Sequence, residues 1–223
     1  MKINIIKLLL GTIIAISISG CGTMATKNSM AGDDDATSSE IEDVKDIKLT
    51  GASENEDLEM IPVEVNEKVE MWIKYFQTRG RPHMERYLAR STRYEALMKK
   101  VLRDNKLPED LFYIALIESG FSSSAFSHAS AVGYWQFIRG TGKRYKLQIN
   151  KMVDDRRDPV LATQAAAAYF KALHDIFDSW YLSMAAYNVG EGRVIRAVKK
   201  YRTKDFWELS RVKRALPAET DNY

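Results

Sequence analysis

A short apolar helix that ends in a single acid is the feature that most constrains this chain. Between Leu107 and Gly120 the sequence reads LPEDLFYIALIESG, with almost no polar face before Glu118. A helix that is apolar nearly all round is buried, and Gly120 supplies the left-handed residue that commonly ends a helix. The pattern predicts a helix, begun near Pro108, that lies in a core and carries one carboxyl group at its end.

Glu118 is the unusual residue of this helix. Burial disfavours the ionised carboxylate, and so does the negative end of the helix dipole, so we expect both effects to raise its pKa. A carboxylic acid that stays protonated near neutral pH can act as a general acid. For an isolated Glu-Ser pair, a solvated glutamate at a helix end is the more common situation. The rest of the sequence decides between these two interpretations.

Two later segments have a composition suited to binding sugars. Residues 133–137 (GYWQF) combine glycine, aromatic rings and an amide, and residues 185–190 (AAYNVG) have a similar character. Aromatic rings can cover the apolar faces of a sugar, and amides can bond its hydroxyl and N-acetyl groups. Together with Glu118, these segments indicate a carbohydrate-active protein.

In this order and spacing, the segments resemble the three motifs of the lytic transglycosylases with a goose-lysozyme-like catalytic domain (glycoside hydrolase family 23). They are most similar to the membrane-bound lytic murein transglycosylase D type. The motifs are Glu118-Ser119, Gly133-Tyr134-Trp135-Gln136 and Ala186-Tyr187-Asn188-Val189-Gly190. Tyr134 stands where the family usually has leucine. The resemblance covers residues 69 to 223 and implies a mainly α, lysozyme-like catalytic domain.

The resemblance implies a peptidoglycan lytic transglycosylase that works with one carboxyl group, although glycosidases ordinarily use two. Glu118 would protonate the oxygen between N-acetylmuramic acid and N-acetylglucosamine, while the substrate's N-acetyl group stabilises the developing cation. Glu118 would then take the proton of the muramic C6 hydroxyl, which closes on C1 to give a 1,6-anhydro product. A hydrolytic muramidase and a non-catalytic cell-wall-binding lipoprotein are the alternatives.

The resemblance also implies six residues that bind substrate or shape the site. They are Ser127, Gln136, Tyr187, Asn188, Ser119 and Gly133. Ser127 would contact the muramic N-acetyl or lactyl group, Gln136 would bond polar groups of the sugar, and Tyr187 would bond Glu118 or the N-acetyl group. The simpler interpretations are a loop serine, a polar residue at a helix start and a core tyrosine.

Other polar residues have structural explanations. Four acids could supply a second carboxylate, but all lie at expected helix starts or turns, where acids are favoured: Asp154, Asp155, Asp158 and Glu191. The three histidines, His83, His128 and His174, lack the spacing of metal ligands. We therefore expect no metal and no cofactor.

The first 21 residues resemble a lipoprotein export signal. Two lysines precede an apolar run from Leu8 to Ile18, which is typical of a signal peptide over residues 1–20. Cys21 follows in the position that bacteria lipidate, and it is the single cysteine of the chain. The absence of aspartate after Cys21 implies the outer membrane, facing the periplasm.

Residues 21–60 are acidic and poor in large apolar side chains, so we expect a disordered linker. Residues 61–223 contain 28 Lys and Arg against 19 Asp and Glu, a net charge of +9. Nucleic acid, a solvated basic face and the carboxylates of peptidoglycan stem peptides could each explain this charge. The export signal argues against nucleic acid and favours glycan strands with their stem peptides, bound by a monomer.

The remaining sequence has the spacing of helices throughout and no alternation typical of strands. We expect a helical extension over residues 61–104 and the catalytic domain over 105–223. Predicted helices include one that ends at Gly80, one capped by Ser91, and one that begins at Asp158-Pro159 and continues to Phe177. Pro217 resembles a helix start, so the domain is expected to continue beyond Tyr223.

Overall fold

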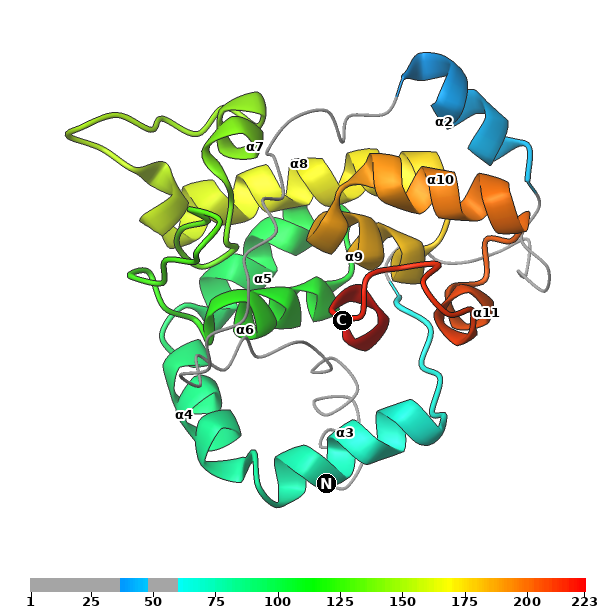
Figure 1. Ribbon diagram of the computed structural model, residues 1–223. Helices are drawn as coiled ribbons and strands as arrows, with labels where there is room; N and C mark the ends of the chain where they lie inside the picture. Colours follow the sequence, from blue (N-terminus) through cyan, green and yellow to red (C-terminus); the bar gives the residue numbers. More distant parts are fainter. Residues whose placement is uncertain (1–36, 48–59) are drawn as a thin grey trace. The chain divides into compact units, whose positions relative to one another are not determined.

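The computed structural model of the protein describes residues 37–47 and 60–223 (Figure 1). Every regular element in these ranges is a helix, and the only bridges of β type there are isolated ones. The predicted mainly α fold is therefore confirmed. The expected signal peptide and Cys21 lie outside the described residues. No helix in the described ranges combines the length and the apolar character needed to cross a membrane.

The described residues form two compact units. One contains residues 60–171, and the other contains residues 37–47 and 172–223. The boundary between them falls within helix α8. The predicted boundary at residue 104, between a helical extension and a catalytic domain, remains a prediction.

The first unit contains most of the helices that precede α8. They are α3 (Glu67–Gln77), α4 (Arg81–Ser91), α5 (Glu95–Asp104), the 3₁₀ turn η1 (Glu109–Leu111), α6 (Phe112–Ser119), α7 (Arg139–Arg144), the 3₁₀ turn η2 (Asp155–Arg157) and the start of α8 (Pro159–Phe177). Asp158 caps α8 as predicted, because its carboxylate accepts the N–H groups of Val160 and Leu161, both at 2.8 Å. Ser91 does not cap α5; it ends α4 and bonds the carbonyl of Leu88.

The core of the first unit is built around α6. The residues from Phe112 to Leu116 are all buried, as the apolar sequence predicted. Trp135 is fully buried, and its indole N–H donates to the hydroxyl of Thr163 in α8 at 2.9 Å. Helix α5 also packs against α6 (Figure 1), so the helix that carries Glu118 is held by the burial of its apolar residues.

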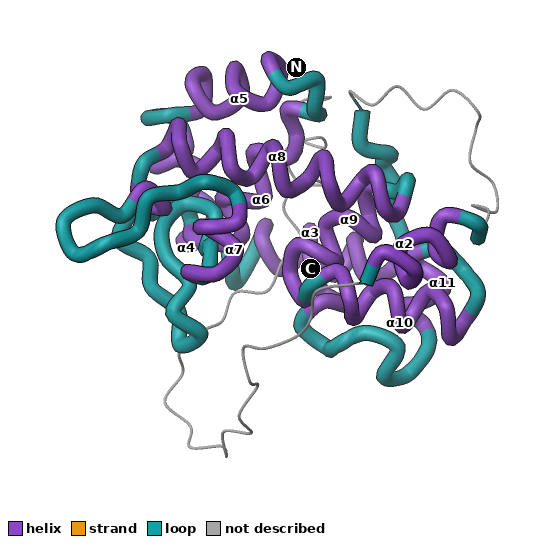
Figure 2. Tube along the Cα trace, turned by 90° about the horizontal axis from the view of Figure 1, so that it is seen from above, coloured by secondary structure: helices purple, strands orange, loops and turns teal. Residues whose placement is uncertain are grey.

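The chain on both sides of α7 is loop rather than helix (Figure 2). The segment between α6 and α7 is held by two isolated antiparallel bridges, which pair Val132 with Phe126 and with Phe137. A third bridge pairs Ile149 with Asp154 after α7. The loop between α6 and α7 contains the residues of the second predicted motif.

The second unit contains the end of α8 and the helices that follow it. They are α9 (Trp180–Val189), α10 (Glu191–Tyr201), α11 (Phe206–Arg211) and the 3₁₀ turn η3 (Thr220–Asn222), together with α2 (Ser38–Lys45). Ser179 caps α9 and Asp205 caps α11 through their side-chain oxygens. The helix start predicted near Pro217 is followed by the short turn η3, and its continuation beyond Tyr223 remains a prediction.

Helix α2 corrects the expectation of a disordered linker over residues 21–60. Thr37 and Glu40 form a capping box at its start. Val44 is fully buried, and Asp43 pairs with Lys199 of α10 at 2.6 Å. The acidic composition masked one apolar residue that α10 covers, so the prediction of disorder is wrong for residues 38–45.

Candidate active site

Glu118 lies in the last turn of α6, where the buried part of the helix ends. Its side chain is half-buried, whereas the residues one turn earlier are buried. Gly120 ends the helix with φ +57°, as predicted, and a Cβ atom there would overlap the ring of Tyr87. The structure therefore holds one carboxyl group at the end of a buried apolar helix.

Ser119 joins this helix end to the second motif. Its hydroxyl donates to the carbonyl oxygen of Tyr134 at 2.8 Å, lies 3.0 Å from the carbonyl oxygen of Ala115, and accepts the N–H of Ser122 at 3.2 Å. The first and second motifs are 15 residues apart in sequence at this bond. This contact brings the two motifs together, and the shaping role of Ser119 remains a prediction.

The aromatic residues of the second motif do not form a sugar-binding surface. The side chains of Tyr134, Trp135 and Phe137 are all buried, and burial raises the pKa of the Tyr134 hydroxyl. The interpretation of these rings as sugar contacts is therefore wrong, because the core of the first unit takes them up. Earlier in the loop between α6 and α7, Phe126 is exposed, with 67% of its surface accessible.

Gln136 is the half-buried polar residue of the motif. Its backbone has φ +47°, a left-handed conformation that is uncommon for a residue with a side chain. Its amide donates to the carbonyl oxygen of Gly133 at 2.9 Å. Gln136 is not a polar residue at a helix start, the simpler interpretation, because α7 begins three residues later at Arg139.

Gly133 is required by a close approach of two backbones. Its φ is +80°, and a Cβ atom there would overlap the carbonyl oxygen of Arg156. Ser127 lies in the same loop, half-buried, where its hydroxyl accepts the N–H of Ala131 at 3.1 Å. Both residues therefore have clear local roles in the loop between α6 and α7.

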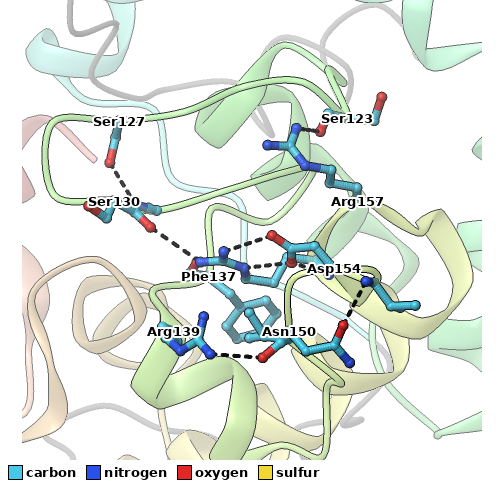
Figure 3. A network of polar contacts seen from close by, with 12 residues as sticks. Ser123, Ser127, Ser130, Phe137, Arg139, Asn150, Asp154 and Arg157 are labelled. Carbon is cyan, nitrogen blue, oxygen red and sulfur yellow. Dashed lines mark hydrogen bonds and ion pairs between the residues drawn. The ribbon is translucent and has the colours of Figure 1, made fainter.

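Three of the four acids considered as a second carboxylate are engaged in local structure, and Figure 3 shows one of them, Asp154. Asp154 caps η2 and forms a two-point ion pair with Arg156, which lowers the pKa of Asp154. Asp155 accepts the N–H of Gln148 at 2.7 Å, and Asp158 caps α8. These contacts support the structural interpretation that the sequence favoured.

Tyr187 and Asn188 belong to the second unit, near the end of α9. Both are half-buried, and the side-chain amide oxygen of Asn188 (Oδ1) accepts a hydrogen bond from the hydroxyl of Thr220 in η3 at 2.8 Å. Asn188 therefore connects the third motif to the last turn of the described chain. The predicted substrate contacts of both residues remain predictions.

The second unit also contains an open pocket of about 460 Å³ between α10 and the segment before η3. Four basic side chains line it: Arg193, Arg196, Lys200 and Arg214. Among the described residues, no group of three or more His, Cys, Asp or Glu side chains is arranged to hold a metal ion.

The sequence did not predict that Asp154 and Arg156 form an ion pair next to the second motif. Residues 152–157 carry no periodicity, so only their polar character was apparent. The signal that could have identified the pair is an arginine two residues after an aspartate in a turn, which permits a fork-like contact with both carboxylate oxygens.

Comparison with known proteins matches residues 95–210 to a family described as the transglycosylase SLT domain. The chain is 35% identical over 150 residues to the membrane-bound lytic murein transglycosylase D of Escherichia coli strain K12, and equally to that of strain O6:H1. It is 39% identical over 117 residues to a putative tributyltin chloride resistance protein of Alteromonas sp. strain M-1. The match to the E. coli proteins covers 65% of this chain but only 32% of their length. The match to the Alteromonas protein covers 52% of this chain and 56% of that protein. The chain therefore spans about a third of the length of its E. coli relatives.

Proposed function

The chain belongs to the transglycosylase SLT domain family, and from this premise we propose that it is a peptidoglycan lytic transglycosylase. The observation that carries the proposal is the bond between the Ser119 hydroxyl and the Tyr134 carbonyl. It fastens the helix end that bears Glu118 to the segment that bears Gln136. A proton donor and a polar sugar-binding group thus belong to one connected structure.

The proposed reaction uses Glu118 as both acid and base. Glu118 protonates the glycosidic oxygen between N-acetylmuramic acid and N-acetylglucosamine, and the bond to C1 breaks. The substrate's N-acetyl group stabilises the positive charge at C1. Ionised Glu118 then accepts the proton of the muramic C6 hydroxyl, whose oxygen bonds C1 to give the 1,6-anhydro ring. A single carboxyl group is consistent with the local engagement of Asp154, Asp155 and Asp158.

Five other residues complete the proposed site. Ser127, Gln136 and Tyr187 are proposed to bind the sugar. Asn188 supports the third motif through Thr220, and Gly133 allows the loop to approach the backbone of Arg156. The basic pocket lined by Arg193, Arg196, Lys200 and Arg214 supports the view that the positive charge serves the carboxylates of stem peptides.

Product analysis separates this proposal from its alternatives. Purified protein is incubated with peptidoglycan sacculi, and the soluble products are analysed by mass spectrometry. A lytic transglycosylase releases muropeptides with 1,6-anhydromuramic ends, each lighter by one water than its hydrolysed counterpart. Hydrated ends would identify a hydrolytic muramidase. No release, with binding to sacculi retained, would identify a non-catalytic wall-binding protein.

We also propose that the protein is a monomeric lipoprotein of the cell envelope, anchored through Cys21 to the outer membrane on its periplasmic side. The lysines and apolar run before Cys21 support this, as does the word membrane-bound in the name of the E. coli relatives. Cys21→Ala should release the protein from the membrane fraction, because the acyl chains are lost. Unchanged fractionation would contradict the anchor.

A further inference from the structure

Arg156 is a charged residue buried in the first unit, with only 7% of its surface exposed. Figure 3 shows the polar contacts around its partners Asp154, Ser130 and Phe137. The Arg156 guanidinium donates from Nε and Nη2 to the two carboxylate oxygens of Asp154, both at 2.8 Å. Nη1 donates to the carbonyl oxygens of Ser130 at 3.2 Å and Phe137 at 3.0 Å. The planar fork of arginine is suited to such a set of acceptors, and a lysine ammonium is not.

The two carbonyl groups bonded by Arg156 lie at either end of the segment that contains Gly133 and Gln136. The Phe137 carbonyl also accepts the N–H of Val132 at 3.1 Å. Within the segment, the backbone of Gly133 lies against the backbone of Arg156 so closely that no side chain fits. The turn at residues 154–157 therefore fixes this segment by both a side chain and a backbone contact.

Gln136 needs such support because its conformation is strained. A left-handed backbone costs a residue with a side chain roughly 1–2 kcal/mol, and such conformations persist where the surroundings impose them. The next carbonyl along the chain, that of Phe137, receives the bonds from Arg156 and Val132. The Asp154–Arg156 pair is thus placed to hold the backbone that orients the Gln136 side chain.

We infer that Asp154 and Arg156 are positioning residues for the glycan-binding segment, and that they act on substrate through Gln136. This inference rests on the proposed function, because it assumes that Gln136 binds the sugar. Asp154 orients the guanidinium, and the guanidinium holds the carbonyl groups of Ser130 and Phe137. Neither residue touches the reacting atoms, so their loss should weaken substrate binding more than it slows the chemical step.

The first test compares Arg156→Lys with the wild-type chain on soluble peptidoglycan strands. Lysine keeps the charge but cannot bond Asp154, Ser130 and Phe137 together. We expect KM to rise by about 10-fold or more, since a small misplacement of a binding group can cost up to about 100-fold, while kcat changes by less than about 3-fold. Arg139→Lys is the matched control, because Arg139 in the same network bonds only the Ile149 carbonyl and should keep wild-type constants.

A double-mutant cycle then asks whether Arg156 acts through Gln136. Gln136→Ala alone should raise KM, and adding Arg156→Lys to it should raise KM little further, since residues that share one action are non-additive. A merely structural role would give additive effects, and that result would overturn the inference. Wild-type KM in a folded Arg156→Lys protein would also overturn it.

A second variant keeps the test decisive if Arg156→Lys fails to fold. Asp154→Asn retains Arg156 and its two carbonyl bonds but weakens the pair that orients the guanidinium, and it should raise KM in the same direction. An unchanged KM would overturn the inference. An inactive wild-type protein would instead refute the proposed function, so the two failures are distinguishable.

Discussion

The two parts of the candidate site are held in place by different kinds of contact. Helix α6 brings Glu118 to its position through apolar packing, and its residues are neighbours in sequence. The segment from Ser122 to Phe137 is fixed instead by polar contacts from Arg156 and Arg157, which are 19 to 34 residues away from the carbonyls of Phe137 and Ser123 that they bond. The chemical group is thus placed by local pattern, and the binding segment by long-range hydrogen bonds.

The largest effect should come from the helix side of this comparison. Glu118→Gln should lower the rate of sacculus digestion by about 10³-fold or more, because the amide can neither donate nor accept the required proton. The release of soluble muropeptides measures the rate, and thermal unfolding should be unchanged because the side chain is nearly isosteric. Glu85→Gln, which removes an exposed ion pair with Arg81, should keep full activity. Equal activity in both variants would remove Glu118 from the mechanism.

The next effect concerns the backbone contact of the binding segment. Gly133→Ala should lower the free energy of unfolding by about 3 kcal/mol, because a positive φ and an overlap with the Arg156 carbonyl act together. Urea denaturation measures the change. Gly140→Ala is the matched control, since Gly140 lies in α7 with no atom within 4 Å of an added Cβ. It should be stabilising by less than about 1 kcal/mol.

Gly120→Ala tests the corresponding position on the helix side. It should lower the free energy of unfolding by about 1–2 kcal/mol, less than Gly133→Ala. The reason is that the added Cβ meets the Tyr87 ring, which can move, rather than a backbone carbonyl. The same urea denaturation series gives the comparison. A greater loss for Gly120→Ala would show that α6 depends on its end more than on its apolar packing.

The smallest effect concerns the binding segment, whose stability should depend on pH through the Asp154–Arg156 pair. Hydrogen bonds from Arg156 lower the pKa of Asp154 from its ordinary value of 3.8. The unfolded chain therefore binds a proton at higher pH than the folded one, and the stability that Asp154 contributes is present above pH 4 and lost as pH falls through the lowered pKa. Asp154→Asn should be less stable than wild type at pH 6, with a smaller difference at pH 3.

That last prediction is checked by urea denaturation at both pH values. Asp110→Asn is a suitable control, because Asp110 lies in η1 and is not part of the Asp154–Arg156 pair. A difference between wild type and Asp154→Asn that stays constant from pH 6 to pH 3 would contradict the ionic contribution of the pair.

The same contrast explains what could be predicted from the sequence. The position of Glu118, the left-handed Gly120 and the capping of α8 by Asp158 follow from local rules, and the structure has all three. Composition alone suggested that Trp135 and Tyr134 face a sugar, but whether an aromatic ring is covered depends on distant residues such as Thr163. The left-handed backbone of Gln136 depends on Arg156 in the same way, so no local pattern contained it.

Helix α2 has a consequence for the mechanical reach of the protein. An extended chain spans at most about 3.5 Å per residue. An unstructured stretch from Cys21 to residue 60 would allow roughly 135 Å. Because Val44 is buried and Asp43 pairs with Lys199, the chain is fixed to the second unit from Thr37 on, and the sixteen residues from Cys21 to Thr37 can span no more than about 55 Å. A lipid at Cys21 would therefore limit the distance of the second unit from the bilayer to less than half of the distance that the sequence alone suggests.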